Sequence, residues 1–201
     1  PGLKTTGPGW AVKKGRVIGV ALAVEGWKGY FPLAHPGGGN FDEKVFTRQL
    51  KKILDLPCDK IFHNAIYDVG WLSTMGLEVK GRIVDTMIAA PLVDENKRNY
   101  SLKEIAQEYI GETKSEAGLY EAAKDFGVDA KAEMHLLPAM YVGPYAEQDA
   151  TVTLKLWQTL KVELLKQELT SVFNLETELL PMLFQMKKRG VRVDIEKAER
   201  V

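Results

Sequence analysis

The stretch "HNAIYDVGWL", residues 63–72, decides the fold class because it joins a strand signal to a helix signal. The short apolar segment before it, "KIF" at 60–62, predicts a buried strand. Asn64 is placed to cap a helix, and Gly76 is placed to end it. A strand followed directly by a helix is a building unit of α/β folds. Within that helix, Asp68 is a lone carboxylate among apolar and aromatic neighbours, which raises the question of its role.

Composition sets limits on the class of protein. The chain has 201 residues and 45% hydrophobic content, enough for one sizeable core or one core and the start of a second. Lys plus Arg and Asp plus Glu each total 27, and this balance neither requires nor excludes a nucleic-acid partner, because a local groove can be basic on a neutral protein. No apolar run is long enough to cross a bilayer, and residues 1–10 lack a secretory signal pattern. The single cysteine, Cys58, cannot form an internal disulfide, which agrees with a reducing compartment. We therefore expect a cytoplasmic protein with no membrane partner.

The predicted elements alternate between strands and helices. Two strand-like segments flank the turn Glu25-Gly26 and predict a hairpin. Residues 112–143 are less regular and predict short helices, and a long helix is expected from Gly143-Pro144 onward, with the proline near its first turn. In chain order the segments are strands 16–24 and 29–33, helix 41–54, strand 60–62, helix 64–76, strand 83–85, a helix framed by the capping box Ser101–Glu104 and by Gly111, and the long helix. This order predicts an α/β architecture, a sheet with helices on its faces.

Tyr145 and Asp149 lie four residues apart near the start of the long helix. That spacing places a phenol and a carboxylate on one helix face. Taken alone, the pattern is more often a surface acid beside a packed tyrosine. A functional role is favoured here because the pattern follows "HNAIYDVGWL", "VDTMIAAPLV" and "SLKEIA" in that order. Each of these segments lies at the end of a predicted element of one α/β sheet.

These motifs resemble those of the 3′-to-5′ proofreading exonuclease of family A DNA polymerases, the tyrosine-containing DEDD type. Asn64 and Asp68 are similar to its second motif, and Tyr145 with Asp149 to its third. The resemblance covers nearly the whole chain. It implies a ribonuclease H-like fold, a mixed β-sheet flanked by helices. The loop "HPGGGNFD" and the segment "YAEQDA" favour polymerases of bacteria-infecting viruses and their relatives.

The C-terminal part of the chain extends the resemblance. The segment "LETELLPMLFQMKKRGVRVD", residues 175–194, is similar to the opening of the polymerase module in that family. We therefore expect two domains, the 3′-5′ exonuclease at 1–168 and the start of the polymerase module at 169–201. The implied partners are the single-stranded 3′ end of DNA, primer–template DNA and the polymerase domain of the same chain.

The resemblance also implies a chemistry, the hydrolysis of a phosphodiester with two Mg²⁺ (or Mn²⁺) ions as cofactors, roughly 4 Å apart. Carboxylate oxygens are the side-chain ligands that Mg²⁺ prefers. By this resemblance Asp68 and Asp149 hold the metals, the Tyr145 hydroxyl orients the attacking water, Asn64 contacts the terminal nucleotide, and Leu3 separates the last bases. The structural alternative for Asp68 is an acid in the first helical turn that offsets the helix macrodipole.

The first motif of the family, an Asp-x-Glu on the first strand, supplies two further acids. No such pattern occurs between Pro1 and the first predicted strand. Gly2-Leu3 matches the pair that usually trails the motif, so we expect the two acids just upstream of Pro1. Glu25 and Asp42-Glu43 do not belong on a first strand and are not substituted for them. Asp85 recurs in the family as a fold-stabilising acid at a strand end and is kept outside the catalytic set.

Two alternative functions stay open. One is a stand-alone DEDD exonuclease of the ribonuclease D kind, against which the segment 175–194 argues. The other is a catalytically inactive structural or DNA-holding domain of a polymerase, which the absent first motif favours and which the presence of Asp68, Tyr145 and Asp149 opposes. The source also stays open between a bacterial cell, a phage-infected host and an organelle. Some basic residues could contact phosphates, although such residues more often form a solvated surface. They are Lys13, Lys14, Arg16, Lys51 and Lys52.

Overall fold

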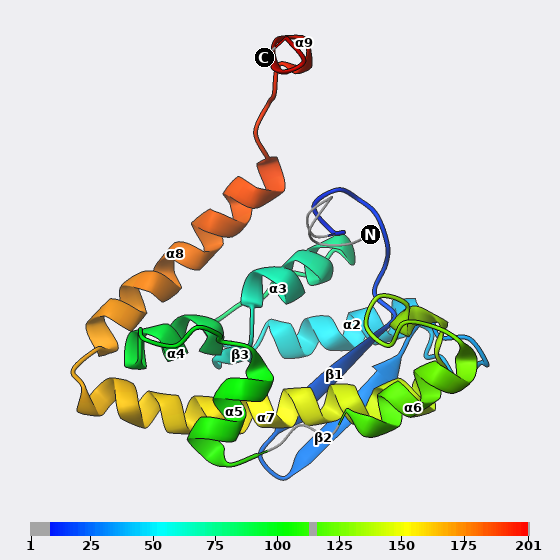
Figure 1. The fold of residues 1–201 in the computed structure, drawn as a ribbon, viewed down its shortest axis with the longest axis horizontal. Helices are drawn as coiled ribbons and strands as arrows, with labels where there is room; N and C mark the ends of the chain where they lie inside the picture. Colours follow the sequence, from blue (N-terminus) through cyan, green and yellow to red (C-terminus); the bar gives the residue numbers. More distant parts are fainter. Residues whose placement is uncertain (1–8, 113–115, 201) are drawn as a thin grey trace.

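The central element of the fold is a 28-residue helix, α7 (Ala139–Lys166), on which both sheets and several other helices pack (Figure 1). The computed structural model describes residues 9–112 and 116–200. One stripe of α7 is apolar and at most 2% exposed, and it consists of Val152, Leu156, Leu160 and Leu164. The four-residue spacing of this stripe places it on one helix face, as the sequence predicts. None of the described helices is long and apolar enough to cross a membrane.

The first sheet is the predicted hairpin. Its antiparallel strands, β1 (Gly19–Val24) and β2 (Trp27–Pro32), are joined by a two-residue turn. Gly26 in this turn has a φ of 76°, which a residue without a Cβ adopts at no steric cost. The backbone N–H of Tyr30 donates to Glu147 Oε1 at 3.1 Å, which ties the hairpin to the part of α7 that carries the predicted third motif.

The second sheet contains the strand–helix unit that residues 60–76 predict. Strands β3 (Lys60–Phe62) and β4 (Ile83–Asp85) are parallel, and α3 (Ala65–Thr74) connects them. The parallel and antiparallel strand directions that were expected are therefore present. They occur in two separate two-stranded sheets, because within residues 9–112 and 116–200 no strand pairs with a strand of each sheet.

Other helices surround this frame, and the two that were expected at 41–54 and from the capping box to Gly111 lie close to their predicted positions. The surrounding helices are α2 (Glu43–Leu54), α4 (Thr86–Val93), α5 (Leu102–Ile110), α6 (Ala117–Phe126), the 3₁₀ turn η1 (Met134–Leu136), α8 (Thr170–Arg189) and α9 (Ile195–Ala198). Asp42 caps α2, since its Oδ1 accepts the Val45 N–H at 2.8 Å. The helix predicted from the capping box does begin after Ser101, but the Ser101 side chain makes no capping hydrogen bond.

The start of α7 differs from the prediction. The helix begins at Ala139, so Pro144 lies inside it rather than near its first turn. Burial of Leu137 at 0% and Val142 at 2% exposure anchors the chain before the proline and lets the helix start earlier. A second anchor is His35, whose Nδ1 donates to the Leu137 carbonyl at 2.7 Å.

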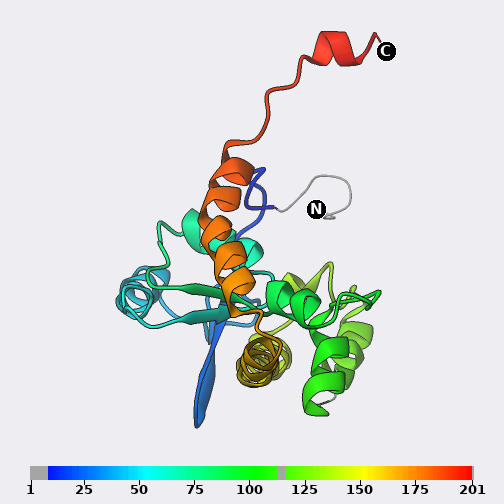
Figure 2. The same cartoon turned by 90° about the vertical axis from the view of Figure 1, so that its left-hand side faces the viewer.

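The core consists of three clusters, and α8 contributes to the largest. Phe173 of α8 is 1% exposed and packs with Trp157 of α7 at a ring distance of 5.2 Å. From this contact α8 runs away from the sheets, and its C-terminal end and α9 stand clear of them (Figure 2). The expected domain boundary between residues 168 and 169 falls in the short connection from α7 to α8 and stays a prediction.

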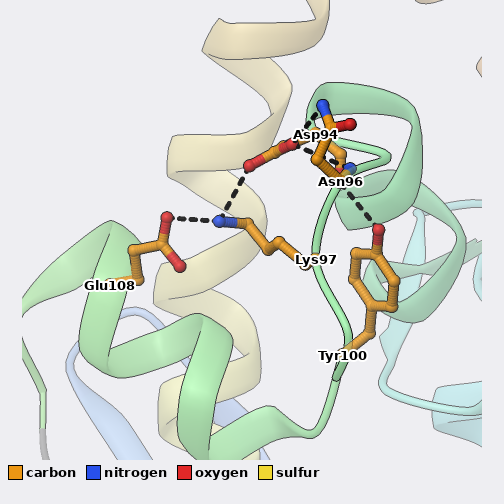
Figure 3. A network of polar contacts seen from close by, with 5 residues as sticks. All are labelled: Asp94, Asn96, Lys97, Tyr100 and Glu108. Atoms are coloured by element: carbon orange, nitrogen blue, oxygen red, sulfur yellow. Dashed lines mark hydrogen bonds and ion pairs between the residues drawn. The ribbon is translucent and has the colours of Figure 1, made fainter.

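A polar network fixes the connection between α4 and α5 (Figure 3). The Lys97 ammonium contacts Asp94 at 3.0 Å and also pairs with Glu108 of α5. The Tyr100 hydroxyl donates to the Asp94 carbonyl at 2.8 Å. Hydrogen bonds to Glu108 and then Asp94 raise the pKa of Lys97, so this charge persists at any physiological pH.

Candidate active site

The Asp85 carboxylate organises the start of two helices. Asp85 ends β4 and is 4% exposed. Its oxygens accept the backbone N–H groups of Asn64 at 2.9 Å, Ala65 at 2.7 Å and Met87 at 2.9 Å. Because N–H groups at helix starts have no intrahelical partner, this one carboxylate caps both α3 and α4. The expectation that Asp85 stabilises the fold is confirmed.

Asn64 occupies the cap position of α3 but does not cap it with its side chain, contrary to the prediction. The Tyr67 N–H, one of the groups that an Asn64 side-chain cap would take, donates instead to the Asn64 backbone carbonyl at 2.9 Å, and Asp85 accepts the N–H groups of Asn64 and Ala65. The Asn64 backbone is left-handed, with φ 71° and ψ 57°, a conformation that asparagine tolerates better than most residues. Its exposed amide is therefore available to a ligand.

Asp68 lies in the first turn of α3, in a setting that disfavours its charge. Burial, and then the negative charge of Asp85, raise the pKa of Asp68 from 3.8 to about 7. A carboxylate that served only to offset the helix macrodipole would have a lowered pKa, and the direction of the shift at Asp68 is the opposite. A divalent cation beside Asp68 would reverse both effects and favour the ionised form.

Tyr145 and Asp149 form the second half of the predicted site, on α7. A side-chain hydrogen bond links them, as the four-residue spacing allows. Burial, followed by the charge of Asp149, raises the pKa of Tyr145 above its usual value of 10. The phenol therefore keeps its proton at neutral pH. The ring packs against a cluster that includes Leu137, Val142 and Tyr30, which fixes its position at the hairpin.

Sequence analysis missed two charged residues beside Tyr145. Glu116, whose side chain is 13% exposed, pairs with Lys131 at 3.3 Å, and both charges act on the Tyr145 phenol. They come from the irregular segment between α5 and α7, where no periodicity or motif marks them. Only the packing of that segment against α7 brings them to the site.

The structure assembles the predicted residues in two pairs, Asp68 with Asp85 and Tyr145 with Asp149. The two pairs lie on adjacent elements, since β3, which leads into α3, packs on α7. In the described residues, no three or more His, Cys, Asp or Glu side chains are grouped to hold a metal. The carboxylates present therefore fit Mg²⁺ in kind, but they supply fewer ligands than a complete site needs. Leu3 lies outside the described residues.

Comparison with known proteins identifies the family. A family model for the 3′-5′ exonuclease of DNA polymerase A matches residues 15–165. The chain belongs to this family. It is thus the 3′-5′ exonuclease domain of a family A DNA polymerase, a family whose exonuclease domains normally use divalent metal ions. This match confirms the resemblance that the motifs indicated.

Relatives come from phages and from bacteria. The DNA-directed DNA polymerase of Pseudomonas phage M6 is 36% identical over 100% of this chain and 31% of its own length. DNA polymerase I of Pseudomonas aeruginosa is 30% identical over 90% of this chain and 20% of its own length. The chain thus spans a third or less of these polymerases. Their identity as polymerases argues against the ribonuclease D alternative.

A solved structure confirms the fold class. A chain described as the apo form of the nuclease matches with a TM-score of 0.64 and 22% sequence identity, covering 87% of this chain and 77% of that chain. This similarity supports the ribonuclease H-like α/β fold that the sequence predicts.

Proposed function

We propose that this domain removes mispaired nucleotides from the single-stranded 3′ end of a DNA primer as 5′-monophosphates, by hydrolysis that depends on two Mg²⁺ ions. The observation that carries the proposal is the setting of Asp68. A half-buried carboxylate that feels the negative charge of the second carboxylate, Asp85, is an arrangement that a bound cation would neutralise.

Each predicted site residue has a distinct role in the proposal. Asp68 and Asp149 hold the metal ions through their carboxylate oxygens, and the exposed Asn64 amide contacts the terminal nucleotide. When bound, the divalent ions supply an activated water and stabilise the leaving 3′ oxygen.

Tyr145 acts by positioning rather than by taking a proton. Its raised pKa keeps the hydroxyl protonated at neutral pH, so the phenol is a hydrogen-bond donor and acceptor and not a base. Asp149 holds the hydroxyl through the hydrogen bond between them, and packing in the hairpin cluster limits the rotation of the ring. A hydroxyl fixed in this way can orient the attacking water.

We further propose that the domain works within a polymerase, in the cytoplasm of a bacterium or a phage-infected host. The phage and bacterial relatives support this setting, and their length beyond the matched region leaves room for the polymerase module. The substrate is then the frayed end of the primer–template DNA that the same polymerase extends.

The test is nucleotide release from a labelled single strand by the full-length protein, with and without Mg²⁺. Asp149→Asn removes a metal-binding charge with little change in shape, and we expect at least about a hundredfold loss of rate, since a lost metal contact removes several kcal/mol of transition-state stabilisation. Asp125→Asn is the matched control, because Asp125 is an exposed acid on α6. Equal rates for the two variants would show that Asp149 has no part in hydrolysis, and absence of Mg²⁺-dependent release by the wild type would support the inactive DNA-holding domain instead.

A further inference from the structure

A cavity of about 580 Å³ has a lining that includes none of the residues of the proposed site. It forms where the loop 9–15, the C-terminal end of α3 and the C-terminal end of α8 meet. Figures 1 and 2 both show the N-terminal loop beside these two helices. Its volume falls within the range of ligand-binding pockets in proteins.

The cavity is built from fixed aromatic contacts. Trp10 is 4% exposed and packs on Phe184 of α8 at a ring distance of 5.4 Å. Its indole covers Gly70 of α3 so closely that a Cβ there would lie 2.2 Å from the ring. Lys14 N–H donates to the Gly9 carbonyl at 2.8 Å and closes the loop. The walls are therefore held in place by the fold.

Among the described residues, the lining is basic and contains no acid. Lys13, Lys14 and Lys188 line the cavity, and all three are exposed. Within the described part of the chain, none of their ammonium groups takes part in an ion pair, while Lys188 lies 5.8 Å from the ring centre of Phe184. Unpaired ammonium groups around an aromatic floor are suited to an anion that carries a flat ring.

The two hydroxyl groups of the lining are already engaged, whereas the buried Trp10 Nε1–H has no hydrogen-bond partner among the described residues. The Ser73 hydroxyl donates to the Gly70 carbonyl at 2.8 Å, and the Thr74 hydroxyl donates to the Trp71 carbonyl at 2.7 Å. Their hydrogens are thus not offered to a ligand. Recognition of the charge of an anion in this cavity falls to the lysines.

The structure also separates the two lysine pairs that the sequence left equivalent. Lys51 pairs with Asp55 at 2.6 Å, so its charge is compensated on the surface of α2. Lys13 and Lys14 keep their charges and face the cavity together with Lys188, which is distant in sequence. Convergence of lysines from two separate segments distinguishes a site from a solvated surface.

We propose that this cavity binds the backbone phosphates of a single DNA strand, with a base against Trp71, and so holds the strand whose 3′ end enters the exonuclease site. The inference rests on the proposed function. Asp68 and Trp71 are three residues apart on α3, so the cavity begins within about 5 Å of Asp68 along the helix axis. A strand ending at Asp68 has its preceding phosphates within reach of the lysines.

The first experiment maps lysine reactivity on the full-length protein. Lysines are acetylated with and without a sixteen-nucleotide oligothymidylate, in EDTA so that no hydrolysis occurs, and the labelled sites are read by mass spectrometry. We expect protection of Lys13, Lys14 and Lys188 but not of Lys44 and Lys161, which are exposed on α2 and α7. Parallel samples contain inorganic phosphate or polyglutamate in place of DNA.

The second experiment measures affinity. The triple variant Lys13→Ala, Lys14→Ala, Lys188→Ala is compared with the charge-matched control Lys44→Ala, Lys52→Ala, Lys161→Ala in binding of the same labelled strand. We expect about tenfold weaker binding at moderate salt for the cavity variant alone. The slope of log affinity against log salt should fall by about 2, since each phosphate contact to a single strand contributes about 0.7.

Each outcome decides the proposal. Protection by the strand together with the smaller salt slope supports it. Equal protection by inorganic phosphate would indicate a site for free anions, and equal protection by polyglutamate would indicate a general polyanion surface. Equal affinities of the two triple variants would show that the cavity lysines do not bind the strand. Any of these three results overturns the proposal. Because binding is read in EDTA, a protein that binds the strand here yet hydrolyses nothing would refute the proposed function and leave only the strand-binding site of this inference standing.

Discussion

Asp68→Asn should make the metal-free chain more stable above neutral pH. The variant keeps the shape of the side chain and removes its charge. In the folded chain the pKa of Asp68 is raised from 3.8 to about 7, by burial first and by Asp85 second. Between these two pH values the folded state binds a proton that the unfolded state has released, so this group lowers the stability of the wild type as pH rises.

The magnitude follows from the size of the pKa difference. A difference of about 3 at 1.36 kcal/mol for each pKa unit sets a limit of about 4 kcal/mol, reached above pH 7. Below about pH 4 the carboxyl is protonated in both states, and the wild type and Asp68→Asn should differ little. The stability difference between them should therefore grow from near zero to a few kcal/mol as pH rises from about 4 to about 8.

The assay is urea unfolding in EDTA at several pH values, followed by the fluorescence of the four tryptophans. Asp125→Asn, an exposed acid on α6, is the control and should leave the pH profile parallel to that of the wild type. Added Mg²⁺ should stabilise the wild type at about pH 8 more than it stabilises Asp68→Asn. Parallel pH profiles for wild type and Asp68→Asn would show that Asp68 is not held beside Asp85, and the proposed metal setting would fail.

Three further variants test the fold and the site. Asp85→Ala leaves three backbone N–H groups without their acceptor, including the buried Ala65 N–H, and should lower the free energy of unfolding by about 3 to 5 kcal/mol in urea; a loss under about 1 kcal/mol would contradict the double cap. Pro144→Ala restores a donor to the Met140 carbonyl inside α7 and should raise the free energy of unfolding by about 1 to 2 kcal/mol, seen as a higher melting temperature. A lower melting temperature would show that α7 needs the proline. Tyr145→Phe removes only the hydroxyl and should slow nucleotide release about tenfold or more with unchanged metal affinity, so unchanged turnover would exclude its role in orienting water.

Local patterns in the sequence were enough to predict most elements. The hairpin follows from two apolar segments around Glu25-Gly26, and the β3–α3 unit follows from an apolar triplet and a cap position. Their signals lie within a few residues of the structure that they specify. The start of α7 was misplaced because burial of Leu137 and Val142 outweighs the local preference for proline in the first turn.

The residue types of the site could be predicted from the sequence, but the raised pKa of Asp68 and the capping of α3 by Asp85 could not. The spacing of Tyr145 and Asp149 fixes their contact, since both lie on one helix face. The capping of α3 by Asp85 joins residues that are 20 positions apart, and the raised pKa of Asp68 depends on that contact and on burial. Contacts of this range depend on the packing of β4 beside β3 and leave no periodic trace in the sequence.

In the proposed function Asp68 and Asp149, on different helices, serve one metal-dependent nuclease site. Mg²⁺-dependent release of 5′-mononucleotides should be measured for the full-length protein carrying Asp68→Asn, Asp149→Asn or both substitutions. If the two carboxylates act as a unit, each single variant and the double variant should show nearly the same residual rate. Losses that multiply in the double variant, or a single variant with the wild-type rate, would show that the two carboxylates do not share a site.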